Sequence, residues 1–327
     1  MTSQTDPSIT IDLPLTREDP DLLKTEITRG LLANPKTLPS KLFYDERGST
    51  LFEQICELPE YYQTRTEHQL LTRWADEIVS ISEAEELVEL GSGAATKTRL
   101  LLDAMANVNQ LHYFVPFDVD ETIVRRVSEE LVREYPGLHI HGVVGDFLVH
   151  LEHIPEGGKR LVVLLGGTIG NLPALAAHEF LSSVNSEMAQ GDYFLLGVQL
   201  ITDRNRLEAA YNDQQGITAK FNKNIIRVLH NQFGSQSDSE SFDHVARYNE
   251  ADHRIEMWLR SRGDQTLGIQ DLDLNVHLKQ GEEIRTEIST KYDRPLAEKL
   301  LASSGFALVK WYSDPDSLIG LALAKKP

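Results

Sequence analysis

The sequence predicts an α/β protein in which a mostly parallel, doubly wound, nucleotide-binding sheet is joined to a second, α+β region. Three observations support this prediction. Residues 87–90 form an apolar run that meets Gly91 and Gly93 and is followed by leucines at helical spacing, which indicates a strand, a tight turn and a helix. Residues 160–165 are almost continuously apolar, as in a parallel strand buried on both faces. Past residue 200 the alternation of strands and helices stops.

The segments before this sheet are expected to be helices and loops. Residues 1–18 are rich in Thr, Ser, Asp and Pro and are expected to form a mobile tail. Apolar residues at helical spacing predict helices over residues 19–34, 51–57 and 67–79. Tyr61 and Tyr62 follow Pro59 in a loop, where such residues either line a pocket or pack the loop onto the body.

The sheet is expected to follow, with helices between its strands. The predicted strands are residues 87–90, 111–118, 140–144, 160–165 and 193–198, and the predicted helices are residues 100–105, 121–134 and 179–188. Residues 296–303, 307–312 and 318–324 predict a helix and a closing pair of strands. The chain therefore returns to this domain near residue 290.

The intervening region is expected to be a separate α+β domain. Helices are predicted over residues 203–214 and 218–231, a polar loop over 235–241, and antiparallel strands over 253–262, 265–276 and 283–289. Asp271 and Asp273 would share one solvated face of a strand. We expect residues 19–62 with 201–289 to form one domain, and residues 63–200 with 290–327 the other.

Composition argues against several kinds of partner. The 327 residues are 41% apolar and 25% charged, as in ordinary globular proteins. With 50 acidic and 32 basic residues the net charge is -18, so the surface repels phosphates, and we expect no nucleic-acid and no membrane partner. A single cysteine, Cys56, fits a cytoplasmic protein without disulfides. His150, Glu152 and His153 lack the spacing of a metal motif and are expected to be solvated.

The turn after the first strand indicates the class of ligand. Thr96 stands where a dinucleotide motif requires Gly or Ala. Glu89 would lie at the strand end, where a carboxylate repels a pyrophosphate but attracts a sulfonium or ammonium group. The turn therefore favours S-adenosylmethionine and methyl transfer over a nicotinamide cofactor and hydride transfer. A turn without any ligand is the remaining alternative.

Other strand ends carry further candidate residues, because open α/β sheets bind ligands beyond the carboxyl ends of their strands. Asp118 ends the second strand, where a carboxylate holds ribose hydroxyls. Asp146 and Phe147 follow the third strand and can contact an adenine amino group and ring. The glycine-rich segment 166–172 lets a small acceptor approach the backbone closely.

Taken together, the loop motifs resemble one family. They are KLFYD at 41–45, LPEYYQTRTE at 58–67, ELGSG at 89–93, PFDVD at 116–120, GDF at 145–147, GGTIGNL at 166–172, YND at 211–213, FN at 221–222, RIEMWL at 254–259 and TEIS at 286–289. In these motifs the chain resembles the histidine-specific, S-adenosylmethionine-dependent methyltransferases of ergothioneine biosynthesis, over nearly its whole length beyond the tail. One departure is Gly167, where a relative has serine.

The resemblance implies a Rossmann-like class I methyltransferase sheet with a second α+β substrate domain. It also implies an N-methyltransferase that adds three methyl groups to the α-amino group of L-histidine, giving the betaine hercynine. S-adenosylmethionine would be the methyl donor, L-histidine the small-molecule partner, and no metal would be required. A cytoplasmic monomer is expected.

The resemblance further assigns residues to each ligand. Cofactor binding is implied for Tyr44, Gly91, Lys97, Asp118, Asp146 and Phe147. The amine would lie near the proposed catalytic group, which is Tyr61, Gly166, Thr168 and Asn171. Substrate binding is implied for Asn171 and Tyr211 at the carboxylate, for Tyr61, Met257, Glu287 and Ser289 around the imidazole, and for Phe52 in the wall.

The chemistry is consistent with these residue types. A neutral amine attacks a methyl group on a sulfonium directly, so alignment of the lone pair is the main requirement, and no covalent nucleophile is required. The amine also loses protons between rounds, through a tyrosine hydroxyl, a backbone carbonyl or water. Glu287 and Ser289 lie two residues apart on a predicted strand, so they point the same way and can hydrogen-bond both imidazole nitrogens.

Two alternatives remain open from the sequence. One is a methyltransferase of the same fold that acts on another amino acid or a small amine, which a change at Glu287 or Met257 would indicate. The other is a non-catalytic protein that binds the cofactor or histidine, in which at least one motif should be damaged. All of these motifs are intact.

Overall fold

The computed structural model describes residues 8–14 and 21–327, and these form two compact units. The first unit contains residues 8–14, 66–200 and 292–327, and the second contains residues 21–65 and 201–291. The chain changes unit between residues 14 and 21 and again after residues 65, 200 and 291. The sequence-based boundaries lie after residues 18, 62, 200 and 289.

The first unit is built on an eight-stranded sheet with the order β1-β5-β4-β3-β6-β7-β14-β13. The strands from β1 to β7 in this order are parallel, and β14 runs antiparallel to both of its neighbours. The strands are β1 (Ile9–Asp12), β3 (Glu86–Leu90), β4 (Tyr113–Asp118), β5 (His139–Val144), β6 (Arg160–Leu164), β7 (Tyr193–Gln199), β13 (Ala307–Ser313) and β14 (Ile319–Lys325).

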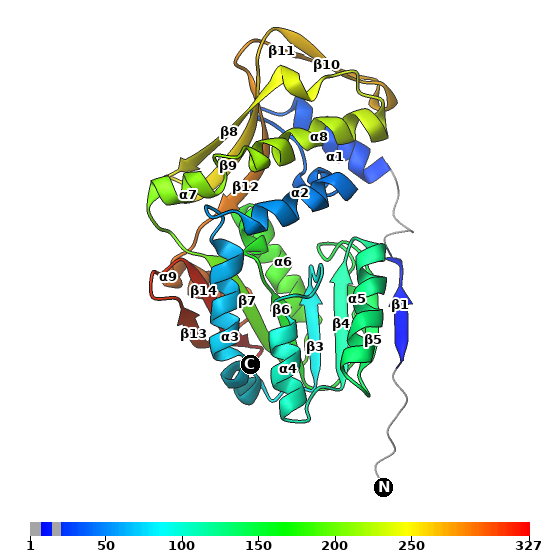
Figure 1. Cartoon of the computed structure of the whole chain (residues 1–327), viewed down its shortest axis with the longest axis vertical. Coiled ribbons are helices and arrows are strands. Elements are labelled where there is room, and N and C mark those ends of the chain that lie inside the picture. Colours follow the sequence, from blue (N-terminus) through cyan, green and yellow to red (C-terminus); the bar gives the residue numbers. More distant parts are fainter. Residues whose placement is uncertain (1–7, 15–20) are drawn as a thin grey trace. The chain divides into compact units, whose positions relative to one another are not determined.

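The helices of the first unit cover both faces of this sheet. Figure 1 shows α3, α4 and α5 in front of the strands and α6 behind them. The helices are α3 (Gln63–Ser82), α4 (Arg99–Asn107), α5 (Glu121–Glu134), α6 (Ala174–Ser186) and α9 (Arg294–Ser303). Apolar side chains of α6 and α9 pack with those of β3, β6 and β7 in one core, for example Leu181, Leu301, Val88, Leu164 and Leu196.

The strand order places one switch point in this sheet, between β3 and β6. From β3 the chain continues to β4 and β5 on one side, and it returns to β6 and β7 on the other. Open α/β sheets bind their ligands where the order reverses, at the carboxyl ends of the strands. The loops after β3, β4, β5 and β6 are therefore the candidate ligand-binding loops. The α/β prediction is confirmed.

Strand β1 differs from the expected mobile tail over residues 1–18. Ile9–Asp12 pairs in parallel with β5, and the amide of Ile140 donates a hydrogen bond to the carbonyl of Ser8 at 2.9 Å. Without it, β5 would be an edge strand with unpaired backbone groups, and β1 satisfies them. Residues 1–7 and 15–18 of the expected tail lie outside the described residues.

The second unit contains a four-stranded sheet in the order β2-β12-β9-β8 and a separate two-stranded sheet of β10 and β11. The helix α8 packs on the larger sheet and against α2. The strands are β2 (Lys36–Thr37), β8 (Phe242–Asn249), β9 (Arg254–Ser261), β10 (Gln265–Ile269), β11 (Leu274–Leu278) and β12 (Glu283–Thr290), and the helices are α1 (Asp21–Leu32), α2 (Glu46–Glu57), α7 (Arg204–Ala210) and α8 (Ile217–Phe233).

The predicted strand over residues 265–276 is wrong as a single element. The chain turns at Gln270–Leu272, and Asp273, the next residue, has a φ of 47°. Strands β10 and β11 pair as a hairpin on either side of this turn. Asp271 and Asp273 therefore lie in a turn and do not share a strand face. Aspartate suits position 273, because Asp tolerates the left-handed conformation.

Two further results concern charged and apolar groups in the described part of the chain. Within residues 8–14 and 21–327, no helix is long and apolar enough to cross a membrane. The same residues contain no group of three potential metal ligands.

His150, expected to be solvated, is 8% exposed and accepts a hydrogen bond at Nδ1 from the amide of Asp146 at 3.1 Å. This correction follows from a local turn that the sequence pattern does not reveal.

Candidate active site

The glycine turn after β3 requires conformations that only glycine adopts freely. Gly91 has a φ of 76° and Gly93 a φ of 47°, where a Cβ would be strained. The amides of Gly91 and Ser92 donate to the carbonyl of Phe117 at 2.8 and 3.1 Å. The turn is thereby fixed to the end of β4, beside Asp118.

Asp118 is held at this turn by backbone amides. Its Oδ2 accepts a hydrogen bond from the amide of Gly93 at 2.8 Å, and its Oδ1 accepts one from the amide of Asp120 at 3.1 Å. Burial raises the pKa of Asp118, although these amides oppose the shift. Each oxygen keeps a further acceptor position, which is what a ribose hydroxyl requires.

Glu89, at the end of β3, has an unsatisfied oxygen. The side chain is 4% exposed, and its Oε1 accepts a hydrogen bond from the Thr98 hydroxyl. Its Oε2 has no hydrogen-bond partner among the described residues. Burial raises the pKa of Glu89 to about 8, while Thr98 and Lys97 lower it. A buried carboxylate in this state is stabilised by a cation, so the turn fits a ligand that carries an ammonium or sulfonium group.

Phe147 lies directly beside this turn. A Cβ on Gly91 would stand 3.5 Å from Cε1 of Phe147. The Phe147 ring also contacts those of Phe180 at 5.5 Å and Phe117 at 6.4 Å between centroids. Its neighbour Asp146 accepts a hydrogen bond from the amide of Leu148 at 2.9 Å. The turn after β5 thus presents an aromatic ring and a carboxylate together.

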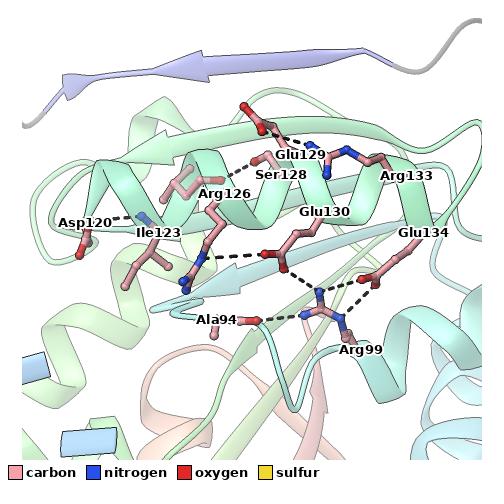
Figure 2. A network of polar contacts seen from close by, with 11 residues as sticks. Ala94, Arg99, Asp120, Ile123, Arg126, Ser128, Glu129, Glu130, Arg133 and Glu134 are labelled. Carbon is pink, nitrogen blue, oxygen red and sulfur yellow. Dashed lines mark hydrogen bonds and ion pairs between the residues drawn. The ribbon is translucent and has the colours of Figure 1, made fainter. Parts of the chain in front are cut away.

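The far side of the glycine turn is anchored by Arg99 at the start of α4 (Figure 2). Its guanidinium donates to the carbonyl of Ala94 at 3.0 Å and contacts the carboxylates of Glu130 and Glu134 on α5 at 3.2 and 3.0 Å. Asp120 caps α5 by accepting from the amide of Ile123 at 3.2 Å. It also accepts from the amide of Thr122 at 2.9 Å. The contacts of Arg99 therefore tie the glycine turn to α5.

Glu67, on α3, organises the end of β6, and the sequence reasoning assigned it no role. Its two carboxylate oxygens accept from the amide of Gly166, both at 2.9 Å, and one of them pairs with the Lys97 ammonium. A Cβ on Gly197 would overlap the carboxylate. Glu67 therefore bridges the Gly166 amide and the Lys97 ammonium. No local pattern in the sequence could show this bridge, because the three residues are far apart in the chain.

Thr168 and Asn171 follow in a short helical turn, Thr168–Asn171. The Thr168 hydroxyl donates to the carbonyl of Leu165 at 3.0 Å. Gly167, the departure from the family pattern, has a φ of 70°, and a Cβ there would stand 2.8 Å from Cγ of Gln199. The backbone of this chain therefore suits glycine at this position, and Asn171 is left half-buried at the end of the turn.

In the second unit, four of the predicted residues form a continuous aromatic row. Ring centroids are 5.8 Å apart for Tyr44 and Phe52, 6.2 Å for Phe52 and Tyr61, and 6.3 Å for Tyr61 and Tyr211. Burial raises the pKa of Tyr61 well above its usual value, and nearby Tyr211 adds to the shift. The Tyr61 phenol therefore keeps its proton at neutral pH.

Strands β9 and β12 bring three of the four predicted imidazole-binding residues together. Glu287 lies directly opposite Met257, and Ser289 opposite Ile255. Directly opposed residues of an antiparallel pair share a face of the sheet, so Met257, Glu287 and Ser289 are neighbours. Burial raises the pKa of Glu287 to about 7, and the charge of Lys291 lowers it in part.

Lys291 was not among the predicted residues, yet it lies at the centre of this group. It is fully buried, and its Nζ donates to the Ser289 hydroxyl at 2.7 Å and to the Tyr211 hydroxyl at 3.0 Å. The same ammonium lies 4.7 Å from the centre of the Tyr211 ring. Burial lowers the pKa of Lys291 to about 7, opposed by the charge of Glu287. The spacing of residues 287, 289 and 291 continues one strand face, which is the signal that could have found it.

A model of the family described as histidine-specific methyltransferase, SAM-dependent, matches residues 23–326. The chain belongs to this family. It is 46% identical to the histidine N-alpha-methyltransferase of Mycolicibacterium smegmatis and 45% identical to that of Mycobacterium tuberculosis, in both cases over 93% of this chain and 95% of the relative. It is also 31% identical to ergothioneine biosynthesis protein 1 of Neurospora crassa, over 88% of this chain and 33% of that protein.

Membership of the histidine-specific methyltransferase family confirms the predicted cofactor class, and hydride transfer is excluded. The structure places Gly91, Lys97, Asp118, Asp146 and Phe147 in the first unit, around the turns after β3, β4 and β5. Gly166, Thr168 and Asn171 follow β6 in the same unit. The other predicted residues belong to the second unit, and they are Tyr44, Phe52, Tyr61, Tyr211, Met257, Glu287 and Ser289.

Proposed function

We propose that this methyltransferase adds three methyl groups to the α-amino group of L-histidine and forms hercynine, the first intermediate of ergothioneine biosynthesis. The observation that carries the proposal is the group of Glu287, Ser289 and Met257, which offers a carboxylate and a hydroxyl beside an apolar side chain. A ring with two nitrogens and an apolar edge matches this group. The names of the mycobacterial and Neurospora crassa relatives support the same acceptor and pathway.

For the methyl donor, we propose binding by Gly91, Lys97, Asp118, Asp146 and Phe147 in the first unit and by Tyr44 in the second. S-adenosylmethionine supplies a methyl group on a positively charged sulfur. Glu89 joins this set, because its unpartnered buried oxygen is suited to the cationic end of that molecule. Asp118 accepts from ribose hydroxyls, and Phe147 stacks with the adenine.

For the acceptor, we propose that Asn171 and Tyr211 hold the α-carboxylate and that Glu287 and Ser289 bind the imidazole nitrogens. Phe52, Tyr61 and Met257 supply apolar walls. A site built to hydrogen-bond its substrate rejects analogues without the matching groups, because its own buried groups are then left unpaired. Histidine specificity follows from Glu287 and Ser289 on this basis.

The catalytic group proposed for the amine is Tyr61, Gly166, Thr168 and Asn171. These residues orient the nitrogen so that its lone pair faces the methyl group, and this alignment is the main source of rate. Because the pKa of the Tyr61 phenol is raised by burial, it does not act as a free base at neutral pH. It can pass on a proton from the amine only as it gives up its own, to water or to a neighbouring acceptor.

The acceptor is a small molecule, and we propose that no nucleic acid and no membrane takes part. The net charge of -18 supports this, since it disfavours both anionic partners. We further propose a cytoplasmic monomer. Sedimentation velocity at micromolar concentration tests the monomer, and a concentration-dependent shift to a dimer would contradict it.

The proposed reaction is tested by incubating the purified chain with S-adenosylmethionine and L-histidine and counting methyl groups by mass spectrometry. We expect the mono-, di- and trimethylated products in sequence, with the trimethylated betaine as the end point, and S-adenosylhomocysteine in matching amount. Histidine left unmodified, or a product that stops at one methyl group with donor in excess, would contradict the proposal.

A further inference from the structure

We propose that Lys291 sets the hydrogen-bond polarity of the imidazole-binding group, so that Ser289 acts as a donor and Glu287 as an acceptor toward the substrate ring. Lys291 would be a positioning residue, since it acts through these two side chains. The inference rests on the proposed function, and it specifies which form of the imidazole the group accepts.

In its ammonium form, which the nearby charge of Glu287 favours, Lys291 has only donors. Lys291 Nζ lies 2.7 Å from the Ser289 hydroxyl oxygen and 3.0 Å from that of Tyr211. Both oxygens must therefore accept from it, and both hydroxyl protons must point elsewhere. All three side chains are at least 95% buried, so bulk water does not relax this constraint.

The hydroxyl oxygens of Tyr211 and Ser289 lie 2.8 Å apart. A phenol is the more acidic group and hence the better donor, so Tyr211 donates to Ser289 when no ligand is bound. The Ser289 oxygen then accepts from both Lys291 and Tyr211, and its proton is directed away from them. If Tyr211 turns its proton toward a bound carboxylate, Lys291 still keeps Ser289 a donor.

Glu287 carries the opposite charge on the same strand face. The ammonium of Lys291 attracts it and thereby favours its ionised form, which has acceptors but no donor. A strand face with a donor at Ser289 and an acceptor at Glu287 matches a neutral imidazole. The ring nitrogen with a lone pair faces Ser289, and the N–H faces Glu287.

The test compares L-histidine with the two pyrrolylalanines, β-(pyrrol-2-yl)- and β-(pyrrol-3-yl)-L-alanine. These keep a ring N–H at one or the other position but have no lone-pair nitrogen. In the unaltered chain we expect kcat/KM for histidine to exceed that for the better pyrrolylalanine by about 100-fold or more, because Ser289 is left unpaired. Comparable values for histidine and a pyrrolylalanine would overturn the proposal without any variant.

Lys291→Gln supplies the second arm. Its amide oxygen can accept the Ser289 proton, so the ratio of the two kcat/KM values should fall about tenfold or more. Ser289→Ala should lower the ratio as well, and adding Lys291→Gln to it should lower the ratio no further. A merely structural lysine would reduce both kcat/KM values alike and leave their ratio unchanged, which contradicts the proposal.

Calorimetric binding of S-adenosylhomocysteine serves as the control for folding, and only variants that bind it are compared. Failure of the proposed function is a separate outcome, because the unaltered chain would then methylate neither histidine nor the pyrrolylalanines. A chain that methylates histidine but does not discriminate against the pyrrolylalanines refutes the role of Lys291 and Ser289 alone.

Discussion

Two carboxylates, the buried Glu89 and the half-buried Glu287, lie where each ligand is proposed to bind. Burial raises the pKa of Glu89 to about 8 and that of Glu287 to about 7. Such groups are costly to keep charged without a partner. A ligand would therefore stabilise the ionised form of each carboxylate. The stabilising group would be a cation at Glu89 and an N–H donor at Glu287.

Glu287→Ala tests the second of these groups. It removes the acceptor for the imidazole N–H, so kcat/KM for histidine should fall by about 100-fold or more, and the preference for histidine over phenylalanine should fall with it. Steady-state kinetics with both amino acids measures this. Glu283→Ala is the matched control on the same strand, because Glu283 pairs with Arg247 at 2.6 Å and Arg260 at 2.8 Å instead. Equal losses in the two variants would contradict the assignment.

The raised pKa of Glu89 predicts that the stability of the chain depends on pH. The pKa of Glu89 is about 8 in the folded chain, against a usual value of 4.5. Between these pH values the folded state binds more protons than the unfolded state, so the contribution of Glu89 to the free energy of unfolding decreases as the pH rises. A bound cation lowers the pKa, so S-adenosylmethionine should raise the melting temperature more at pH 8 than at pH 6.

Thermal unfolding of the unaltered chain and of Glu89→Gln, each with and without S-adenosylmethionine, measures this effect. The ligand titrates identically in both proteins, so the difference between them isolates Glu89. We expect the pH dependence of the ligand shift to be weaker in the variant. Identical pH profiles would show that Glu89 does not face the cation.

At the scale of elements, a glycine in a strand can leave the space that a neighbouring side chain occupies. Gly197 on β7 has no room for a Cβ, which would overlap the Glu67 carboxylate. Gly197→Ala should therefore displace Glu67 from Gly166 and Lys97, destabilise the chain by about 1–3 kcal/mol and weaken binding of S-adenosylmethionine. Chemical denaturation and calorimetry measure the two effects.

The control for this substitution is Gly263→Ala, where a Cβ meets nothing within 4 Å and φ is not in the left-handed region. It should change stability by no more than about 0.5 kcal/mol. If Gly197→Ala behaves in the same way, the tight approach between α3 and β7 is not a constraint on the fold.

The elements that the sequence predicted well are those with a strong local pattern. The apolar runs of β3, β6 and β7 identify buried parallel strands, and the spacing in α5 and α8 identifies helices. Strand β1 was missed because a four-residue strand in a polar segment is fixed only by pairing with β5. The hairpin of β10 and β11 was fused into one strand, although the apolar alternation shifts by one residue between Ile269 and Leu272, where the turn lies.

At the scale of the whole molecule, the site residues divide by the kind of evidence they require. Glycines and carboxylates at strand ends can be predicted from one sequence, because the topology of an α/β sheet places them together. Glu67 contacts Gly166, and Lys291 contacts Tyr211, across elements distant in sequence. The identity of the acceptor required the family resemblance, since fold alone does not specify a substrate.

The central claim is that the acceptor is histidine, and one competition experiment tests it most directly. The purified chain is given S-adenosylmethionine and an equimolar mixture of all twenty amino acids, and the products are identified by mass spectrometry. We expect histidine alone to gain mass, up to three methyl groups. Methylation of another amino acid in preference to histidine would contradict the roles of Glu287 and Ser289, while the fold and the cofactor turn would stand.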